Sequence, residues 1–445
     1  MVKNLLIALL AAFAPFLSIA QNTLYFPPKT GTAWAATPPS ELGFCPERID
    51  SLYQFLESRN TKSFILLKDG KIVLEKYFGT YVQDSIWYWA SAGKSLTAFL
   101  VGQAQEEGLF QIDDATSDYL GAGWTSCTPT QEAAITIRHQ LAMTTGLDDT
   151  PTTNDPDPNN CTDPSCLQYL APPGTRWAYH TGAYRLLQDV IAASSGLTIN
   201  QFTKTRLLDR TGMKGLWIGD VMYGRARDMA RFGLLVQAHG VWDGDTLLHD
   251  QDYFNAMVTP SQDLNQSYGY LWWLNGQPSL MLPGVQFVFP GPLFGNAPPD
   301  LIAALGKNDQ KIHVVPSKGW VVVRQGNSAG YTGIGGNLVP IGFDNDLWAY
   351  LNLLDCNASS TQYAHEAAPA IQVTPNPSSE GIWNIRAVER MDAVEVYDAR
   401  GQRVFVAQPD ADGLRIDGSA WPPGVYFARC LVQGKFSAPM ALVRY

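Results

Sequence analysis

The 445-residue sequence has few charged residues and no run of basic ones. Only 16% of its residues are charged, and the formal net charge is −10 at pH 7. Because nucleic acid binding depends on a positive patch that neutralises phosphates, this balance argues against a nucleic acid partner. Hydrophobic residues make up 46% of the chain. That share is typical of a folded globular protein and argues against disorder or a coiled coil.

The sequence also lacks a C-x-x-C pair, so a zinc site has little support and no metal or cofactor is implied. Beyond the N-terminus it lacks an apolar segment long enough to span a membrane. Residues 5–16 are apolar and are followed by Ser-Ile-Ala, which predicts a signal peptide over residues 1–20 and cleavage before Gln21. We therefore expect an exported, soluble protein with no membrane span in its mature chain.

Export makes the six cysteines eligible for disulfides. Cys161 and Cys166 lie close together in a loop rich in proline, aspartate and asparagine, and a bond between them would close that loop. Six cysteines allow 15 pairings, and the sequence leaves the choice among them open.

Residues 40–356 are expected to form one unit, preceded by an N-terminal lead over residues 21–39. Its apolar pattern predicts a hairpin at 63–75. It also predicts helices after Ser91, at 226–239 and at 344–354, and strands at 301–305, 312–315 and 320–323. Helices fill the middle of this unit while strands come from both of its ends. This arrangement predicts an α+β fold in which distant parts of the chain share one sheet.

The composition and the apolar pattern of the chain change after this unit. Residues 357–370 are small, polar and without pattern, which predicts a linker. Residues 371–445 contain short strand-like runs with frequent turns, which predicts a small all-β sandwich domain. We expect no catalytic site in that domain, because it has no histidine and no clustered acid pair.

Two patterns in the sequence are typical of serine nucleophiles. Residues 326–330 (GNSAG) match G-x-S-x-G, in which Ser328 would lie between a strand and a helix. Several glycines and a proline follow Ser328 and oppose that helix. The only histidine after it is His365, in the predicted linker. An α/β-hydrolase-type esterase using Ser328 is therefore the weaker hypothesis.

Ser91 and Lys94 form the other pattern, S-x-x-K, at the start of a predicted amphipathic helix. Residues three apart on a helix share a face, so the amine can reach the hydroxyl. A serine nucleophile needs a base or a nearby charge, and a lysine in a partly apolar pocket loses its proton more readily. Taken alone, the same pair is equally typical of a solvent-exposed helix.

Further motifs make the sequence resemble the β-lactamase-related serine hydrolases, which include class C β-lactamases, D-Ala-D-Ala carboxypeptidases and esterases. Within that family the sequence is most similar to the 6-aminohexanoate-dimer hydrolases. The resemblance covers about residues 40–356 and implies an antiparallel sheet flanked by helices plus a helical subdomain. It rests on WASAGKSL at 89–96, ITIRHQLAMTTGL at 135–147, GTRWAYHTGAYRLLQDV at 174–190, RARDMARFGLL at 225–235, YGYLWW at 268–273 and the run at 304–324.

The resemblance implies roles for particular residues. Ser91 and Lys94 match the family's first motif, and Tyr179 matches the second, Tyr-x-Asn, in which Thr181 replaces the asparagine. Ser91 would attack an ester or amide carbonyl and form an acyl-enzyme that water clears. Either Lys94 or Tyr179 would act as the base. Thr181 lacks the paired donor and acceptor of an amide, which puts in doubt how an amide substrate would be held.

The third motif is Lys-Thr-Gly or His-x-Gly in the family, and we place it at Gly306, because two strands and a helix are predicted to follow. Residues 328–330 (SAG) are the alternative. The N–H groups of Lys307 and Ser91 would then form the oxyanion hole. Ala304 and Leu305 lack the family's cationic or hydroxyl group, which argues against β-lactam substrates and leaves open whether Lys307 or Arg324 compensates. These departures also suit a catalytically weak, penicillin-binding-like protein that binds wall peptides.

Residues 371–445 resemble the type A sorting domain of proteins exported by the type IX system of Bacteroidetes. The resemblance rests on PNP at 375–377, VEVYD at 394–398, GQRV at 401–404 and PGVY at 423–426. It implies that the type IX secretion machinery is a partner, and that the protein is secreted or held at the cell surface.

Overall fold

The computed structural model describes residues 24–155, 157–331, 341–358, 371–398, 402–409, 411–432, 435–436 and 440–444. The predicted signal peptide, most of the predicted linker and His365 lie outside the described residues. Among those residues, no helix is long and apolar enough to cross a membrane.

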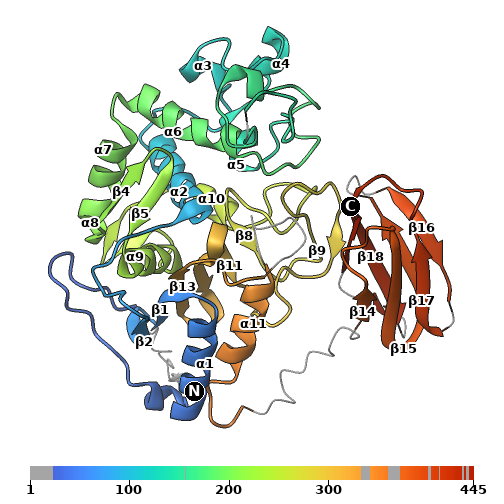
Figure 1. Ribbon diagram of the computed structural model, residues 1–445. Helices are drawn as coiled ribbons and strands as arrows, with labels where there is room; N and C mark the ends of the chain where they lie inside the picture. The colour runs from blue at the N-terminus through green and yellow to red at the C-terminus, as the bar shows by residue number, and fades with distance from the viewer. Residues whose placement is uncertain are drawn as a thin grey trace, which may run out of the picture.

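A six-stranded antiparallel sheet forms the centre of the first domain (Figure 1). Its strands, in spatial order, are β2 (Lys71–Tyr77), β1 (Thr61–Lys68), β13 (Trp320–Gly326), β12 (Gln310–Val315), β11 (Ile302–Gly306) and β8 (Trp273–Leu274). The hairpin expected at 63–75 is present as β1 and β2, and it turns at Asp69 and Gly70, which both have positive φ. Strand β1 pairs with β13, so the sheet joins the two ends of the unit, as its sequence pattern predicts.

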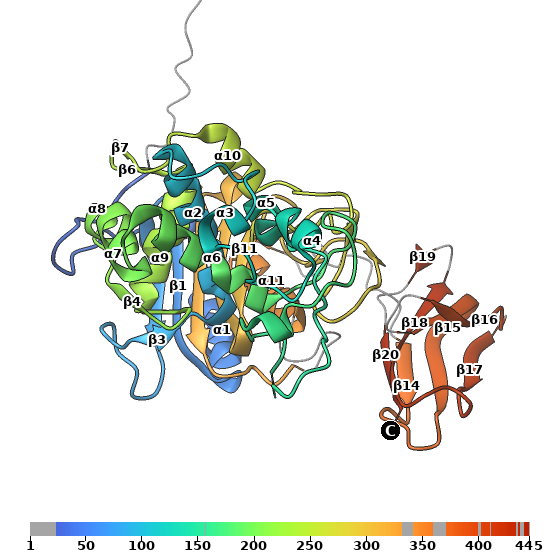
Figure 2. The ribbon, with the colours of Figure 1, turned by 90° about the horizontal axis from the view of Figure 1, so that it is seen from above.

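Helices cover both faces of this sheet (Figures 1 and 2). Helices α1 (Pro46–Ser58) and α11 (Ile341–Asn352) pack on one face, and α9 (Ala226–Gln237) packs on the other. Neighbouring side chains of a strand point to opposite faces. Accordingly, Ile312 of β12 faces α9, while His313 contacts Trp348 of α11. Coverage on both faces explains why β13 is buried along its whole length.

A helical subdomain and a small sheet lie between the two halves of the central sheet in sequence. The small sheet orders its strands as β3 (Trp87–Tyr88), β5 (Val221–Gly224) and β4 (Gly215–Ile218). The long helix α2 (Gly93–Glu106) follows β3, and α10 (Gln251–Met257) packs against it. The remaining helices are α3 (Ser117–Leu120), α4 (Pro129–Ala133), α5 (Ile137–Leu141), α6 (Thr181–Ser195), α7 (Ile199–Thr203) and α8 (Asp209–Thr211). Two short pairs complete the domain: β6 (Val241–Trp242) with β7 (Asp245–Thr246), and β9 (Ser279–Leu280) with β10 (Phe289–Pro290).

A disulfide joins the two ends of this domain. Cys45 lies immediately before α1 and is bonded to Cys356, just after α11. The bond closes a loop of 311 residues, and Arg48 reinforces the junction by donating to the carbonyls of Leu353 and Ala358. Closure of so long a loop restricts the unfolded chain and therefore stabilises the folded one.

The C-terminal part is a separate all-β domain with its own core. Its strands are β14 (Ile371–Thr374), β15 (Ile382–Tyr397), β16 (Arg403–Ala407), β17 (Ala411–Asp417), β18 (Gly424–Val432), β19 (Lys435–Phe436) and β20 (Met440–Arg444). The long strand β15 pairs with β14 and β17 along its first half and with β16 and β18 along its second. The sheet curls around an apolar core that includes Trp383, Val396 and Ile416.

Candidate active site

Ser91 lies in a tight turn between β3 and α2. Ala90–Ala92 form a single 3₁₀ turn, and the Trp89 N–H upstream of it donates to the Met222 carbonyl of β5 at 2.8 Å. Ala90 has a φ of 48°, a left-handed conformation that costs a residue other than glycine roughly 1–3 kcal/mol. Strained backbone of this kind concentrates at functional sites. The turn leaves Ser91 half-buried beside the first residue of α2.

Lys94 is buried next to Ser91. Its Nζ donates a hydrogen bond to Ser91 Oγ over 3.1 Å, as the i, i+3 spacing predicts. The amine also lies 5.2 Å from the ring centre of Tyr179 and 4.4 Å from that of Tyr184. Burial lowers the pKa of Lys94 to about 7, while Asp220 raises it and Arg185 lowers it by smaller amounts. A large fraction of Lys94 is therefore neutral at pH 7 and able to accept a proton.

Tyr179 comes from a distant part of the chain, just before α6, and faces the same serine. Burial raises the pKa of Tyr179 well above its usual value, and a hydrogen bond with Ser91 lowers it only in part. The phenol therefore keeps its proton at neutral pH. Its ring stacks on Trp273 at 5.9 Å and meets Tyr268 edge-on at 6.2 Å. These buried aromatic neighbours fix the ring and exclude water from this side of Lys94.

Asn159 holds the second motif from the loop that precedes it. Its side-chain amide donates to the Tyr179 carbonyl at 3.2 Å and accepts from the Thr181 N–H at 3.1 Å. Its own carbonyl accepts from the Gly182 N–H at 2.7 Å. Nothing in the sequence pattern distinguishes Asn159 from the other polar residues of this loop, and only the fold reveals its position. Thr181 itself begins α6 and is half-buried.

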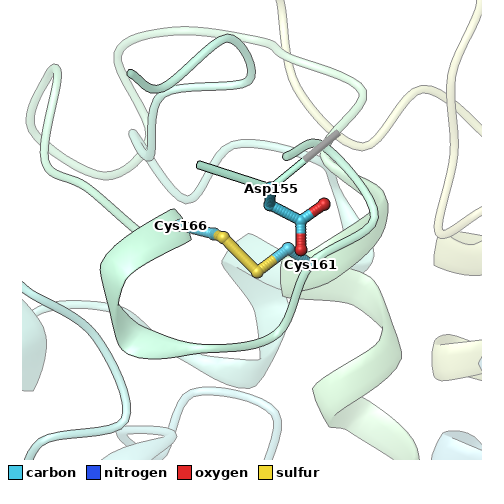
Figure 3. A group of neighbouring side chains, drawn as sticks. All are labelled: Asp155, Cys161 and Cys166. Carbon is cyan, nitrogen blue, oxygen red and sulfur yellow. A yellow bond between two sulfur atoms is a disulfide. The ribbon is translucent and has the colours of Figure 1, made fainter. Parts of the chain in front are cut away.

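The disulfide between Cys161 and Cys166 closes a short loop just after Asn159 (Figure 3), as the spacing of these cysteines in sequence suggested. Asp155 lies beside the two sulfurs, and this is a group of three potential metal ligands among the described residues. Both thiols are consumed by the disulfide, so they are not available as thiolate ligands. The two cysteines therefore constrain the loop through their disulfide and do not act as metal ligands.

His180 is a structural residue. Its Nδ1 accepts from the Ala183 N–H at 3.2 Å and so caps the N-terminus of α6. Burial lowers the pKa of His180 to about 4, which keeps the imidazole neutral and able to accept this bond. The tryptophans that flank the site are core residues for the most part, since Trp89, Trp272 and Trp273 are buried and only Trp87 is half-buried.

Gly306 ends β11 directly against the turn that carries Ser91. A Cβ atom at Gly306 would lie 2.4 Å from the Trp89 carbonyl oxygen and 3.1 Å from the Ala92 nitrogen. Only glycine permits this approach of two backbones, although its φ of −129° is ordinary. The fold thus brings the predicted third motif and the predicted nucleophile side by side. Ala304 and Leu305, which precede Gly306, are both buried and apolar.

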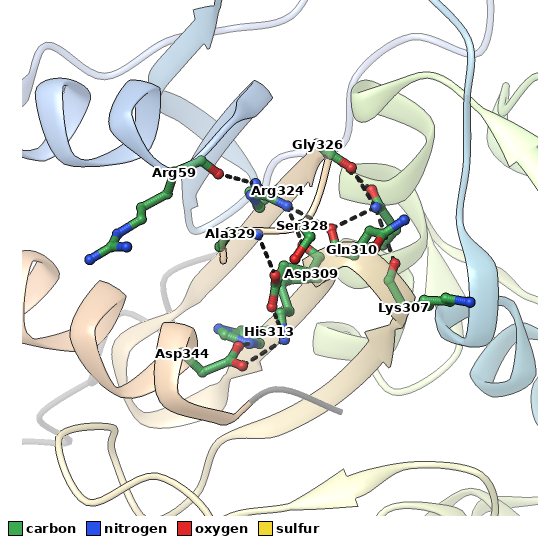
Figure 4. A network of polar contacts seen from close by, with 12 residues as sticks. Arg59, Lys307, Asp309, Gln310, His313, Arg324, Gly326, Ser328, Ala329 and Asp344 are labelled. Atoms are coloured by element: carbon green, nitrogen blue, oxygen red, sulfur yellow. Dashed lines mark hydrogen bonds and ion pairs between the residues drawn. The ribbon is translucent and has the colours of Figure 1, made fainter. Parts of the chain in front are cut away.

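The turn after Gly306 is clamped from beneath by two buried side chains (Figure 4). Gln310 donates to the carbonyls of Lys307 at 3.3 Å and Asn308 at 2.9 Å. Arg324 donates to the carbonyls of Asn308 at 2.9 Å and Asp309 at 3.0 Å. Asn308 and Asp309 both have positive φ, so these bonds compensate a strained backbone. The clamp fixes the three peptides that directly follow the one carrying the Lys307 N–H.

Arg324 is fully committed to this structural role. It also donates to Thr61 Oγ1 and to the carbonyls of Arg59 and Asn327, and it has no exposed surface. The sequence left open whether Arg324 or Lys307 replaces the missing substrate-binding cation. The burial of Arg324 excludes it from that role. Lys307 is exposed, and its side chain points away from the buried network (Figure 4).

Beneath the clamp lies a buried cluster of charges. Lys311 Nζ is 2.6 Å from Asp344 and 3.5 Å from Asp309, and His313 Nε2 is 2.8 Å from Asp344. Burial alone would raise the pKa of Asp344, but Lys311 and His313 lower it below its usual value. Asp309 in turn accepts from the Ala329 N–H at 2.9 Å. Such a cluster is costly to break, because each removed partner leaves a buried charge unpaired.

Ser328 lies in the loop after β13. Its Oγ accepts from the Gly330 N–H at 3.2 Å, and its carbonyl accepts from the Asn60 amide at 2.9 Å. No helix begins within the described residues 329–331 that follow it. Ser328 therefore has the local contacts of a turn residue, and the described residues directly after it do not form the helix that a nucleophile elbow requires.

Comparisons with solved structures find the same fold in several proteins. A protein assigned as a 6-aminohexanoate-dimer hydrolase in Bacillus anthracis matches with a TM-score of 0.56 and 18% identity, over 73% of this chain and 89% of that one. A protein assigned as a beta-lactamase in Bacteroides dorei matches with a TM-score of 0.55 and 16% identity, over 70% and 99%. The octameric penicillin-binding protein homologue of Pyrococcus abyssi matches with a TM-score of 0.52 and 15% identity, over 89% and 94%.

Sequence comparisons agree with this fold. An uncharacterized protein of Alkalihalophilus pseudofirmus is 22% identical over 315 residues, which cover 60% of this chain and 84% of that protein. The model of the secretion system C-terminal sorting domain matches residues 372–438, and the Beta-lactamase model matches residues 54–338. Both resemblances and the predicted fold class are confirmed. The chain belongs to the Beta-lactamase family and ends in a secretion sorting domain.

Proposed function

We propose that the protein is an exported serine hydrolase that cleaves an ester or amide bond through an acyl-enzyme on Ser91. The observation that carries this proposal is the convergence of three groups from two distant segments: the Ser91 hydroxyl, the buried Lys94 amine and the Tyr179 phenol. A serine within hydrogen-bond reach of a base is the signature of an activated nucleophile.

Lys94 is the base in this proposal. Burial favours its neutral form and holds the proton on Tyr179, so at neutral pH the amine can accept and the phenol can donate. Ser91 Oγ attacks the substrate carbonyl while its proton passes to Lys94. Tyr179 then donates a proton to the leaving group and regains a proton from the protonated Lys94. Water hydrolyses the acyl-enzyme by the same steps in reverse order.

The oxyanion would be held by the backbone N–H groups of Ser91 and Lys307. The approach of Gly306 to the Ser91 turn and the clamp on the Lys307 carbonyl, one peptide further along, both support this assignment. Preorganised backbone donors stabilise charge that develops in the transition state and are worth roughly 10²–10³-fold each. In this proposal Thr181, at the start of α6, would border the substrate.

The substrate we propose is a small ester or amide without the carboxylate that β-lactams present next to the reacting bond. Ala304 and Leu305 offer no cation, Arg324 is fully occupied, and Lys307, which directly follows Gly306, is exposed. The likeness to a protein assigned as a 6-aminohexanoate-dimer hydrolase makes linear amides a reasonable class to screen beside simple esters.

Labelling with a fluorophosphonate probe tests the nucleophile. We expect the wild-type protein to be labelled and to hydrolyse p-nitrophenyl esters, and we expect Ser91→Ala to lose both. Ser328→Ala is the matched control, because it removes a hydroxyl from the competing G-x-S-x-G pattern, and it should keep both. Labelling that persists in Ser91→Ala and disappears in Ser328→Ala would overturn the proposal. An unlabelled but folded wild type would favour a protein that only binds wall peptides.

We also propose that residues 371–445 direct the protein through the type IX system to the cell surface or the medium. The match of the sorting-domain model to residues 372–438 supports this route. A chain that lacks residues 371–445 should then accumulate in the periplasm. Normal surface display of that truncated chain would contradict the assignment.

A further inference from the structure

We propose that the sorting domain docks on the hydrolase domain through an aromatic contact, and that this contact supports the segment behind the second motif. Phe287 and Phe289 contribute the hydrolase side, next to β9 and β10. Phe287 lies 4.8 Å from Tyr397 and 6.4 Å from Phe427, ring centre to ring centre, and Phe289 meets Phe427 edge-on at 5.6 Å. Figure 1 shows β9 beside the sheet that contains β18.

Phe427 is buried although it lies on the outer face of its sheet, away from the core of the sorting domain. Along β18, Tyr426 and Ala428 point into the sorting-domain core, so Phe427 points outward with Val425. Val425 is 41% exposed, as expected for an outer position, yet Phe427 is only 2% exposed. The hydrolase domain supplies the missing cover, and Phe427 belongs to the hydrolase core cluster rather than to that of its own domain. An outward phenylalanine on a small domain is a mark of an interface.

On the hydrolase side of the contact, burial alternates along residues 285–289, as in a short strand with one buried face. Val285, Phe287 and Phe289 are buried, while Val288 between the two phenylalanines is exposed. Gln286, within the same segment, donates to the Trp177 carbonyl at 2.9 Å. This bond ties the docking surface to the stretch that ends in the second motif.

Trp177 lies two residues before Tyr179 and packs against the same aromatic group. Its ring is 6.2 Å from that of Trp273 and 5.4 Å from that of Tyr268, and both of these rings also contact Tyr179. Residues 285–289 have few regular backbone hydrogen bonds of their own, apart from the two-residue pairing of β9 and β10. Loss of the sorting domain therefore removes the packing that holds residues 279–290, and Gln286 transmits the loosening to Trp177.

Hydrogen–deuterium exchange on the full-length chain tests this coupling. Phe427→Ala removes the outward ring, and Val425→Ala is the matched control from the same face of the same strand. Truncation of a buried interface aromatic commonly costs more than a factor of ten in the docking equilibrium. We expect peptides covering residues 279–290 and 175–179 to exchange about tenfold faster in Phe427→Ala and to be unchanged in Val425→Ala.

A reciprocal variant guards against simple unfolding of the sorting domain. Phe287→Ala should speed exchange at residues 425–429 by a similar factor while the core strand around Trp383 stays protected. Fast exchange around Trp383 in Phe427→Ala would mean that this variant has unfolded, and Phe287→Ala then decides the matter. Unchanged exchange on the opposite domain in a folded variant would overturn the proposal. None of these readouts depends on hydrolase activity.

Discussion

Substitution of Gly306 by alanine tests the placement of the third motif most directly. The added Cβ would lie 2.4 Å from the Trp89 carbonyl oxygen, about 1 Å inside ordinary contact, and 3.1 Å from the Ala92 nitrogen. Both contacts are backbone atoms of the turn that carries Ser91, so no side chain can rotate away. The end of β11 must therefore shift away from Ser91 by about 1 Å.

A shift of that size separates the two proposed oxyanion donors. Misplacement of reacting groups by about 1 Å costs on the order of 100-fold in rate, and loss of one oxyanion donor costs about 10²–10³-fold. We therefore expect kcat for a p-nitrophenyl ester to fall at least about 100-fold in Gly306→Ala, with a smaller change in KM. The rate of labelling by a fluorophosphonate should fall in parallel, because the first tetrahedral adduct needs the same donors.

The matched control is Gly295→Ala, an exposed glycine of the same domain. A Cβ at Gly295 meets only Asn345 Oδ1, at an ordinary 3.7 Å, so activity and melting temperature should stay close to those of the wild type. Gly306→Ala that retains activity within about threefold, with an unchanged melting temperature, would refute the reasoning. The alternative motif at residues 328–330 would then be tested in the same way with Gly330→Ala, at a position whose φ is +82°.

Three further predictions follow from the buried charge, the disulfide and the altered second motif. Because the pKa of Lys94 lies near 7 and only the neutral amine accepts a proton, kcat/KM should fall about tenfold per pH unit below 7. A flat profile between pH 5 and 8 would contradict Lys94 as the base. Replacing Cys45 and Cys356 together by serine should lower the free energy of unfolding by about 2–5 kcal/mol in urea denaturation while Ser91 still reacts with the probe. Equal stability would show that the bond contributes nothing. Thr181→Asn should raise amide hydrolysis relative to ester hydrolysis, and an unchanged ratio would show that position 181 does not touch the substrate.

Much of the fold could be predicted because the apolar patterns of its main elements are strong. The pattern after Ser91 predicts the helix observed as α2, and the three late runs predict β11, β12 and β13. Even the joining of the first and last strands in one sheet follows from the order of the elements. Short elements of the helical subdomain were not predicted, since four- and five-residue helices depend on capping and tertiary contacts rather than on periodicity.

The proposed catalytic groups could be named from the sequence. The residues that hold the backbone around them could not. Ser91 and Lys94 share one helical turn, so their spacing alone places them together. Asn159 and Arg324 act through backbone groups that are far away in sequence, and a pairing of that kind leaves no pattern in a single chain. Whether Arg324 binds substrate is therefore answered by its burial, because a guanidinium with five protein acceptors has no donor left to offer.

Burial gives the two proton-handling groups their complementary roles in the proposed mechanism. Removing water penalises the charged form of any group, so the same apolar surroundings take a proton from a lysine and keep one on a tyrosine. Lys94 and Tyr179 share those surroundings, in which Tyr184 contacts Lys94 and Trp273 stacks on Tyr179. With the pKa of Lys94 at about 7, about half of the resting sites carry a neutral amine at pH 7, and in these sites charge develops when Ser91 reacts. The motifs supply the functional groups, whereas the aromatic core around them determines which one accepts the proton and which one donates it.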